Sequence, residues 1–177
     1  MQSIEIANLF VQRHGNDLYL TNLKLNKLVY YAQAECLRNT GKSLFTDEIE
    51  AWDYGPVEPM VYYAFSSHGS GRILEPYSPF PSLQPKIAGD ETTREIVDKV
   101  AKQYGSFSAF DLVNFSHRNG SAWKLAYSGE HGVKITEQMI VDSSDGIVKP
   151  CESRKIARGI KTAEKNFPNA FRLLKDS

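Results

Sequence analysis

Residues 22–39 constrain the fold of this chain more than any other segment, because a helix built from them is apolar on almost every side. Thr21 or Asn22 can cap its start, and Gly41 follows its end. The apolar positions at helical spacing are Leu23, Leu25, Leu28, Val29, Tyr30, Ala32, Ala34, Cys36 and Leu37. The remaining stripe, which is expected to stay polar, is Lys24, Lys27, Glu35 and Arg38. A helix of this kind lies inside a bundle rather than on its rim, so we expect a mainly α-helical, single-domain bundle around it.

The segments on either side carry further helix and strand signals. We expect one helix at about residues 4–14 with Ser3 as the cap and another that ends at about Ser67, with Pro56 and Pro59 in its first turn. Further helices are expected from a Thr92–Glu95 capping box to Gly105, after Ser106 or Ser108, and after the capping residues Ser121 and Thr136. Residues 48–54 alternate between apolar and polar side chains, which predicts a short strand or an extended arm that Gly55 and Pro56 interrupt. Residues 66–90 predict a long surface loop with a short strand at 72–75. The expected fold is therefore helical with one small β element near 48–54.

The composition is that of a globular protein with balanced charge. Lys and Arg together number 21, as do Asp and Glu, whereas binders of nucleic acids or anionic membranes usually carry a basic surplus. No apolar run approaches the ~18 residues of a membrane span. Cys36 and Cys151 form no CxxC pair, and the first residues lack the positive region of a signal peptide. We therefore expect a cytoplasmic protein whose partners include neither nucleic acid nor membrane.

A run of small and polar residues, Ser143–Gly146, predicts a boundary near the C-terminus. We expect one domain over residues 1–142 and a helical extension over residues 143–177 that packs on it. The apolar positions at helical spacing in this extension are Ile156, Ile160, Ala163 and Phe167.

Motifs of catalysis or metal binding are absent from the sequence. There is no HExxH, GxSxG, P-loop or GxGxxG pattern, and none of the four histidines has another His or Cys at metal-ligand spacing. We therefore expect no metal, no cofactor and no enzymatic activity. His117 ends an apolar helix, where it can bond the last carbonyls. The alternative is a pocket lined by His117, Tyr54 and an acidic residue.

Two features near the predicted strand have both a structural and a functional interpretation. The acidic residues Asp47, Glu48, Glu50 and Asp53 form either a solvated strand edge or a surface for a basic partner. An aromatic set surrounds the strand and the central helix: Tyr30, Tyr31, Trp52, Tyr54, Tyr62, Tyr63 and Trp123. Such side chains either fill the core or anchor interfaces, and we expect part of the set to be exposed because polar tips need partners.

Three motifs stand out once these features are placed together. They are LKLNKLVYYAQA at residues 23–34, GKSLF at 41–45 followed by IEAWDYGPV at 49–57, and His117 with Ala122-Trp123. Together they resemble the Panacea domain, also called the SocA-like antitoxin domain, over about residues 5–140. The chain departs from the family pattern at Asn26, where Gln is common, and at Ser121-Ala122, which replaces an acidic residue and Pro before the Trp.

The resemblance implies a mainly helical antitoxin of a type II toxin–antitoxin system, which neutralises a cognate toxin by direct protein–protein binding. The implied partner is a toxin encoded by a neighbouring gene, and some relatives occur on phages and other mobile elements. One alternative is a proteolytic adaptor that delivers the toxin to a protease. A second is a small enzyme or ligand-binding module with the His117-centred pocket. The residues assigned to partner binding or to the family signature are Lys24, Lys27, Tyr31, Gln33, Trp52, Tyr54, Gly55, Pro56, His117 and Trp123.

Overall fold

Helices account for most of the regular structure in the computed structural model, which describes residues 1–80, 82–130 and 132–146. The helices are α1 (Ser3–His14), α2 (Asn22–Thr40), α3 (Pro59–Ala64), α4 (Glu91–Tyr104), α5 (Ala109–Ser116), α6 (Ala122–Ala126) and α7 (Glu137–Asp142), with a 3₁₀ turn at Ser66–His68. The strands are β1 (Ile49–Trp52), β2 (Gly55–Val57) and β3 (Lys134–Ile135). The predicted mainly α fold is confirmed, while the C-terminal helix expected around residues 156–167 lies outside the described residues.

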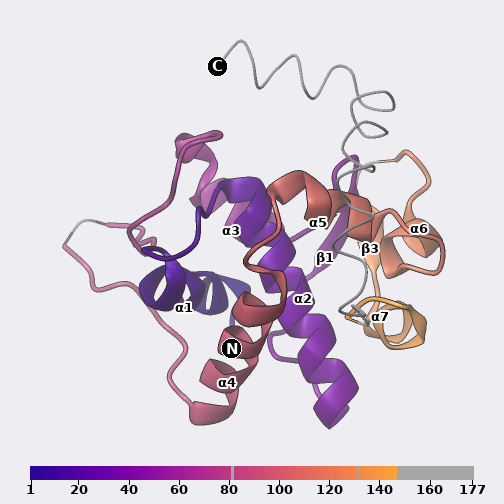
Figure 1. Cartoon of the computed structure of the whole chain (residues 1–177), viewed down its shortest axis with the longest axis horizontal. Coiled ribbons are helices and arrows are strands. Elements are labelled where there is room, and N and C mark those ends of the chain that lie inside the picture. Colours follow the sequence, from indigo (N-terminus) through magenta and orange to yellow (C-terminus); the bar gives the residue numbers. More distant parts are fainter. Residues whose placement is uncertain (81, 131, 147–177) are drawn as a thin grey trace.

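Helix α2 runs through the middle of the molecule, with α1, α3 and α4 on one side and α6, α7 and the small sheet on the other (Figure 1). Every residue of α2 from Lys24 to Leu37 is buried, so the predicted central helix is confirmed. Three residues of its polar stripe, Lys24, Lys27 and Glu35, are buried as well. Each of these side chains has a polar partner, which offsets the cost of removing it from water.

The strands form one antiparallel sheet in the order β2-β1-β3. In the β1–β2 hairpin, Trp52 pairs with Gly55 and Ala51 with Pro56, so Asp53 and Tyr54 form the turn. The predicted strand near residues 48–54 is confirmed. The expectation that Gly55 and Pro56 interrupt the strand is wrong, because both lie in β2. Of the two prolines predicted for the first turn of the next helix, Pro59 begins α3 and Pro56 does not belong to it. Pro56 is tolerated since β2 is an edge strand, where a missing N–H does little harm.

The helix caps were predicted correctly where a hydroxyl side chain accepts the N–H three residues later. Thr21, Ser108, Ser121 and Thr136 all do so. Two other predicted caps are wrong. Helix α1 follows Gln2 rather than Ser3, with the Gln2 N–H donating to the Glu5 carboxylate at 2.8 Å. Helix α4 follows Asp90, whose carboxylate accepts the Thr93 N–H at 2.8 Å and also suits the positive end of the helix dipole.

The segment between α3 and α4 is irregular beyond the short 3₁₀ turn. The strand predicted at residues 72–75 is wrong, because the Ile73 N–H donates to the Leu20 carbonyl at 2.7 Å and the Ile73 side chain is buried instead. Arg72 donates to the Gly15 and Asn16 carbonyls as well, so these contacts hold the segment against the α1–α2 connection.

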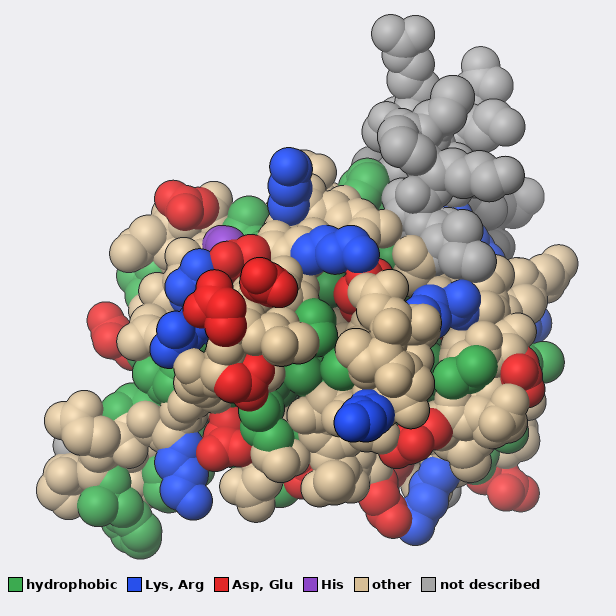
Figure 2. Space-filling view, turned by 90° about the horizontal axis from the view of Figure 1, so that it is seen from below, with side chains coloured by type: hydrophobic (Ala, Val, Ile, Leu, Met, Phe, Trp, Pro, Cys, Tyr) green, Lys and Arg blue, Asp and Glu red, His purple; other side chains and the backbone are tan. Residues whose placement is uncertain are grey.

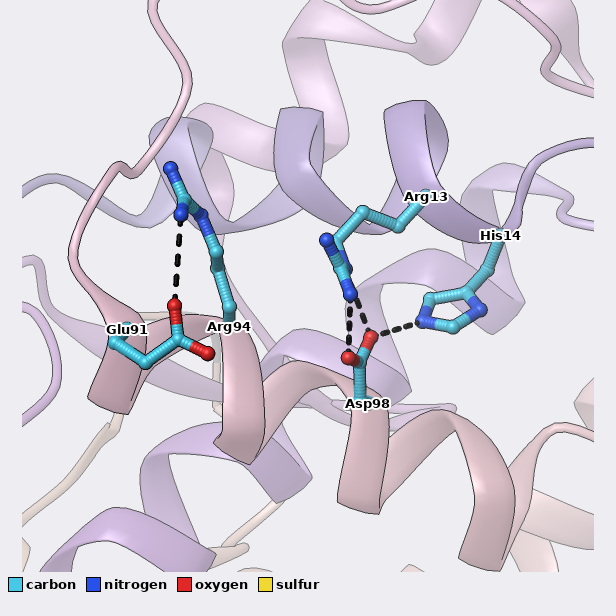
Figure 3. A network of polar contacts seen from close by, with 5 residues as sticks. All are labelled: Arg13, His14, Glu91, Arg94 and Asp98. Atoms are coloured by element: carbon cyan, nitrogen blue, oxygen red, sulfur yellow. Dashed lines mark hydrogen bonds and ion pairs between the residues drawn. The ribbon is translucent and has the colours of Figure 1, made fainter.

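Asp98 of α4 lies between Arg13 and His14 at the end of α1 (Figure 3). Its carboxylate is 2.5 Å from Arg13 Nη2 and 2.8 Å from His14 Nε2, and the Arg13 bond lowers the pKa of Asp98. Exposed ion pairs of this kind stabilise a fold by only about 0–1 kcal/mol. The contact therefore orients the two helices, whereas buried side chains such as Val97 hold them together.

Candidate partner-binding site

The turn of the β1–β2 hairpin is held by side chains from α5 and α6. Trp123 Nε1 donates to the Trp52 carbonyl at 2.7 Å, and His117 Nε2 lies 3.1 Å from the Asp53 carbonyl. The His117 and Trp123 rings are in contact, with centroids 3.6 Å apart. Tyr127, which stacks on Trp123, donates its hydroxyl to the Asp53 carboxylate at 2.8 Å. The predicted His and Trp elements therefore act together on one turn.

Helix α2 holds the same hairpin from beneath through Lys27. Lys27 Nζ donates to the Pro56 carbonyl at 2.8 Å, and burial lowers the pKa of this ammonium group to about 7. At Gly55 the backbone has a φ of 101°, and a Cβ there would lie 2.4 Å from Ser116 Oγ and 3.0 Å from Lys27 Cε. Only glycine fits such a position without displacement. We call Lys27, His117 and Trp123 the hairpin clamp.

His117 links α5 to the hairpin. Its Nδ1 lies 2.7 Å from the Val113 carbonyl, as predicted for a histidine that closes a helix. Burial lowers the pKa of the ring, although the Val113 and Asp53 carbonyls both act to raise it. Both ring nitrogens face carbonyl oxygens, which only accept, so the neutral ring donates to one of the two carbonyls and the protonated ring donates to both. The Ser116 hydroxyl also lies 3.3 Å from Nδ1, so the ring is held by α5 and by the hairpin.

Two of the predicted site residues on α2 support the core away from the hairpin. Lys24 Nζ donates to the Gly105 carbonyl at 2.8 Å, just beyond the end of α4. The Tyr31 ring stacks on the Tyr104 ring with centroids 4.3 Å apart and planes inclined by 5°. Both side chains therefore join α2 to α4, a packing role for which their sequence spacing gave no specific signal.

Gln33 also lies apart from the hairpin. Its amide donates to the Phe45 carbonyl at 3.1 Å, and its oxygen accepts the N–H groups of Leu44 and Phe45. It thereby fixes the segment that leads into β1. The predicted residues that the structure brings together at the hairpin are Lys27, Trp52, Tyr54, Gly55, Pro56, His117 and Trp123.

The hairpin and α3 together present an aromatic surface. Trp52 is half-buried, Tyr62 is 37% exposed and Tyr63 is 66% exposed. The Trp52 ring centroid lies 4.9 Å from that of Tyr62, which lies 5.4 Å from that of Tyr63. We call these three residues the aromatic face. The expectation that part of the aromatic set is exposed is confirmed here, and Tyr54 beside them in the turn is half-buried.

A groove of about 590 Å³ adjoins the aromatic face between α1, α3 and residues 77–86. Its apolar lining includes Ile4, Met60, Tyr63, Tyr77, Pro79 and Leu83. Asn8 holds the loop wall, because its Nδ2 donates to the Tyr77 and Lys86 carbonyls and its Oδ1 accepts the Tyr77 N–H at 2.7 Å. Sequence reasoning missed the groove, since its walls come from three separate segments and no periodicity marks them.

Glu58 is a buried acid at the N-cap position of α3, where its side chain makes no capping hydrogen bond. It is 1% exposed, and its N–H donates to Asn26 Oδ1 at 3.1 Å. Burial, with a smaller contribution from the nearby Asp47 and Glu50, raises the pKa of Glu58 to about 9. The side chain is therefore neutral near pH 7.

Other kinds of site are not apparent in the part of the chain that the structure describes. There, no group of three or more His, Cys, Asp or Glu side chains is arranged to hold a metal ion. No helix among the same residues is both long and apolar enough to cross a membrane. On the face drawn in Figure 2, positive and negative side chains are interspersed, without the broad basic surface that is typical of nucleic-acid binders.

Comparison with known proteins identifies the family. The model of the antitoxin SocA-like, Panacea domain matches residues 25–124, which contain the hairpin and the whole hairpin clamp. The chain is 30% identical over 153 residues to Antitoxin SocA of Caulobacter vibrioides (strain NA1000 / CB15N), which covers 77% of this chain and 79% of that protein. No solved structure matches the chain significantly. Because the family model and this relative both match, the chain belongs to the antitoxin SocA-like, Panacea domain family.

Proposed function

We propose that this protein is the antitoxin of a type II toxin–antitoxin pair and neutralises its toxin by direct protein–protein binding. Membership of the Panacea family and similarity to Antitoxin SocA support the antitoxin role. The structural observation that carries the binding mechanism is a hairpin fixed from beneath with an aromatic face beside it. The proposal assigns the protein no catalytic step and places the pair in the cytoplasm.

The contacts of the hairpin clamp favour a binding surface over an active site. Lys27, His117 and Trp123 all direct polar atoms at backbone carbonyls of the hairpin. Such contacts fix the position of the backbone and leave Trp52 and Tyr63 available to a partner. A surface that is ordered before binding loses less conformational entropy when the partner binds, which favours affinity.

The direct test is to express the product of the neighbouring gene alone and together with this protein. We expect growth arrest in the first case, rescue in the second, and copurification of the two proteins as a stable complex. A neighbouring product that is harmless by itself would rule out the proposal.

The same cells distinguish direct neutralisation from delivery to a protease. Direct binding predicts an unchanged amount and half-life of toxin during rescue, because the complex accumulates. A shortened toxin half-life that a protease-deficient strain restores would instead favour the adaptor alternative.

A further inference from the structure

The hairpin and α3 lie in a segment with an unusual charge distribution. Between Lys42 and Arg72 the chain has no Lys or Arg. The acidic residues in that interval are Asp47, Glu48, Glu50, Asp53 and Glu58. Glu58 is neutral near pH 7, so the other four carboxylates make the segment locally anionic, although the whole chain has a net charge of zero.

Glu50 borders the aromatic face through Trp52, and Asp53 follows Trp52 in the chain. Neither carboxylate forms an ion pair with a described residue, although Lys134 lies opposite Glu50 in the β1–β3 register. Glu50 accepts the Trp52 indole N–H at 2.7 Å, and Asp53 accepts the Tyr127 hydroxyl at 2.8 Å. Both donors are uncharged, so both bonds orient a carboxylate and leave its charge in place. Glu48, in contrast, is paired with Lys134.

The aromatic face itself suits a cation. Trp52, Tyr62 and Tyr63 pack edge to face, an arrangement that leaves ring surface open to a ligand. Among the described residues, the arginines and lysine that stack on rings do so on Tyr19, Phe115 and Trp123, not on the aromatic face. A guanidinium group stacks well on Trp and Tyr and pairs with a carboxylate in the same plane.

The apolar groove continues this surface, because Tyr63 belongs to both. Among the described residues that line it, Lys86 is the one with a charged side chain. The groove therefore suits an apolar side chain that follows a cationic one along a partner segment.

We propose that the aromatic face, with Glu50 and Asp53 at its border and the groove beside it, binds a basic segment of the partner protein. In this complex an arginine lies over the Trp52 and Tyr63 rings and pairs with Glu50, while a neighbouring apolar side chain enters the groove. The inference rests on the proposed function, which makes this partner the toxin.

The test measures the affinity of the full-length protein for the toxin encoded beside it, at about 50 mM and about 300 mM salt. One variant is Glu50→Gln with Asp53→Asn, which keeps both hydrogen-bond acceptors and removes both charges. Its matched control is Glu91→Gln with Glu95→Gln on the exposed part of α4. We expect the first pair to weaken binding about tenfold at low salt and to flatten its salt dependence, with no change in the control.

A second comparison isolates the aromatic contribution. Tyr63→Ala is matched by Tyr19→Ala, because the two tyrosines are 66% and 61% exposed. We expect about a tenfold loss of toxin affinity for Tyr63→Ala alone, with unchanged thermal unfolding in both variants.

The outcomes separate this inference from the proposed function. If the wild-type protein binds and neutralises the toxin but all the variants bind equally well, the surface is wrong and the antitoxin role stands. If the wild-type protein does not bind the toxin, the proposed function itself fails. If the variants change only self-association of the protein, a second copy occupies the surface and the inference is overturned.

Discussion

Lys27 shows how a single buried charge can hold a surface in place. Its ammonium group is 0% exposed and donates to the Pro56 carbonyl. Because burial lowers its pKa from 10.5 to about 7, the folded protein binds fewer protons at this site than the unfolded chain between those pH values. Stability must therefore rise with pH across this window, and the destabilisation is complete below pH 7.

Replacing this residue by methionine makes the effect measurable. We expect the free energy of unfolding of the wild type, minus that of Lys27→Met, to increase by about 2–4 kcal/mol between pH 7 and pH 10. Urea denaturation at several pH values gives both curves. The exposed Lys42→Met serves as the control and should give a difference that does not vary with pH. Parallel curves for wild type and Lys27→Met would contradict the assignment.

At Gly55, in contrast, the fold has no room for a side chain. A Cβ at this position meets Ser116 and Lys27, and the backbone is in the left-handed region. We expect Gly55→Ala to destabilise the fold by about 2–4 kcal/mol. Gly41→Ala, at a φ of 67° but with nothing within 4 Å, should cost only about 1 kcal/mol. Equal losses in chemical denaturation would show that the close approach to Ser116 does not matter.

At the scale of helices and strands, the sequence predicts features that depend on neighbouring residues, such as helix caps. It does not predict contacts between residues that are far apart in the chain. The cap of α5 follows from Ser108 and Asp111, three residues apart, because the capping box is complete within one turn. The hairpin depends on Trp123 and His117, which lie 71 and 64 residues from the carbonyls they contact. A Gly-Pro pair ordinarily ends a strand, and only those distant contacts show why Gly55 and Pro56 continue one.

The burial of Lys24 and Lys27 on α2 could not be predicted from the sequence for a related reason. Lys24 and Lys27 have the spacing of a solvated stripe, and a helical pattern cannot show which carbonyls will cover them. Their partners, Gly105 and Pro56, come from other elements. The sequence therefore predicted the candidate residues of the hairpin but assigned them no common role.

The loop wall of the groove depends on one side chain. Asn8 is 1% exposed and bonds the backbone at both ends of residues 77–86. Asn8→Ala leaves those backbone groups without their partner, so we expect a loss of about 1–3 kcal/mol. Hydrogen exchange should accelerate within residues 77–86 and remain unchanged in α5. The exposed Asn16→Ala is the control, and equal protection of the loop in both variants would contradict this role.

For the whole molecule, residues 143–146 contact the helices that precede them. Asp145 is 5% exposed, and its carboxylate accepts the Tyr30 hydroxyl at 2.5 Å and the Ala122 N–H at 2.9 Å. Arg38 of α2 donates to the Ser143 carbonyl nearby. These contacts tie α2 to α6, next to the residues that hold the hairpin. We therefore propose that the domain includes residues through Gly146 and that the extension begins after it.

Two truncated chains decide where the domain ends. A chain that ends at Asp142 loses the partner of the Tyr30 hydroxyl, which lies on a 0% exposed side chain, whereas a chain that ends at Gly146 keeps it. We expect the shorter chain to be less stable by about 2–4 kcal/mol, visible as a lower midpoint of thermal unfolding. In the full-length protein, Asp145→Asn should cost less, because its amide oxygen can still accept the Ala122 N–H. Equal midpoints of thermal unfolding for the two truncated chains would contradict this proposal. They would support a domain that ends at residue 142, as the composition of residues 143–146 predicts.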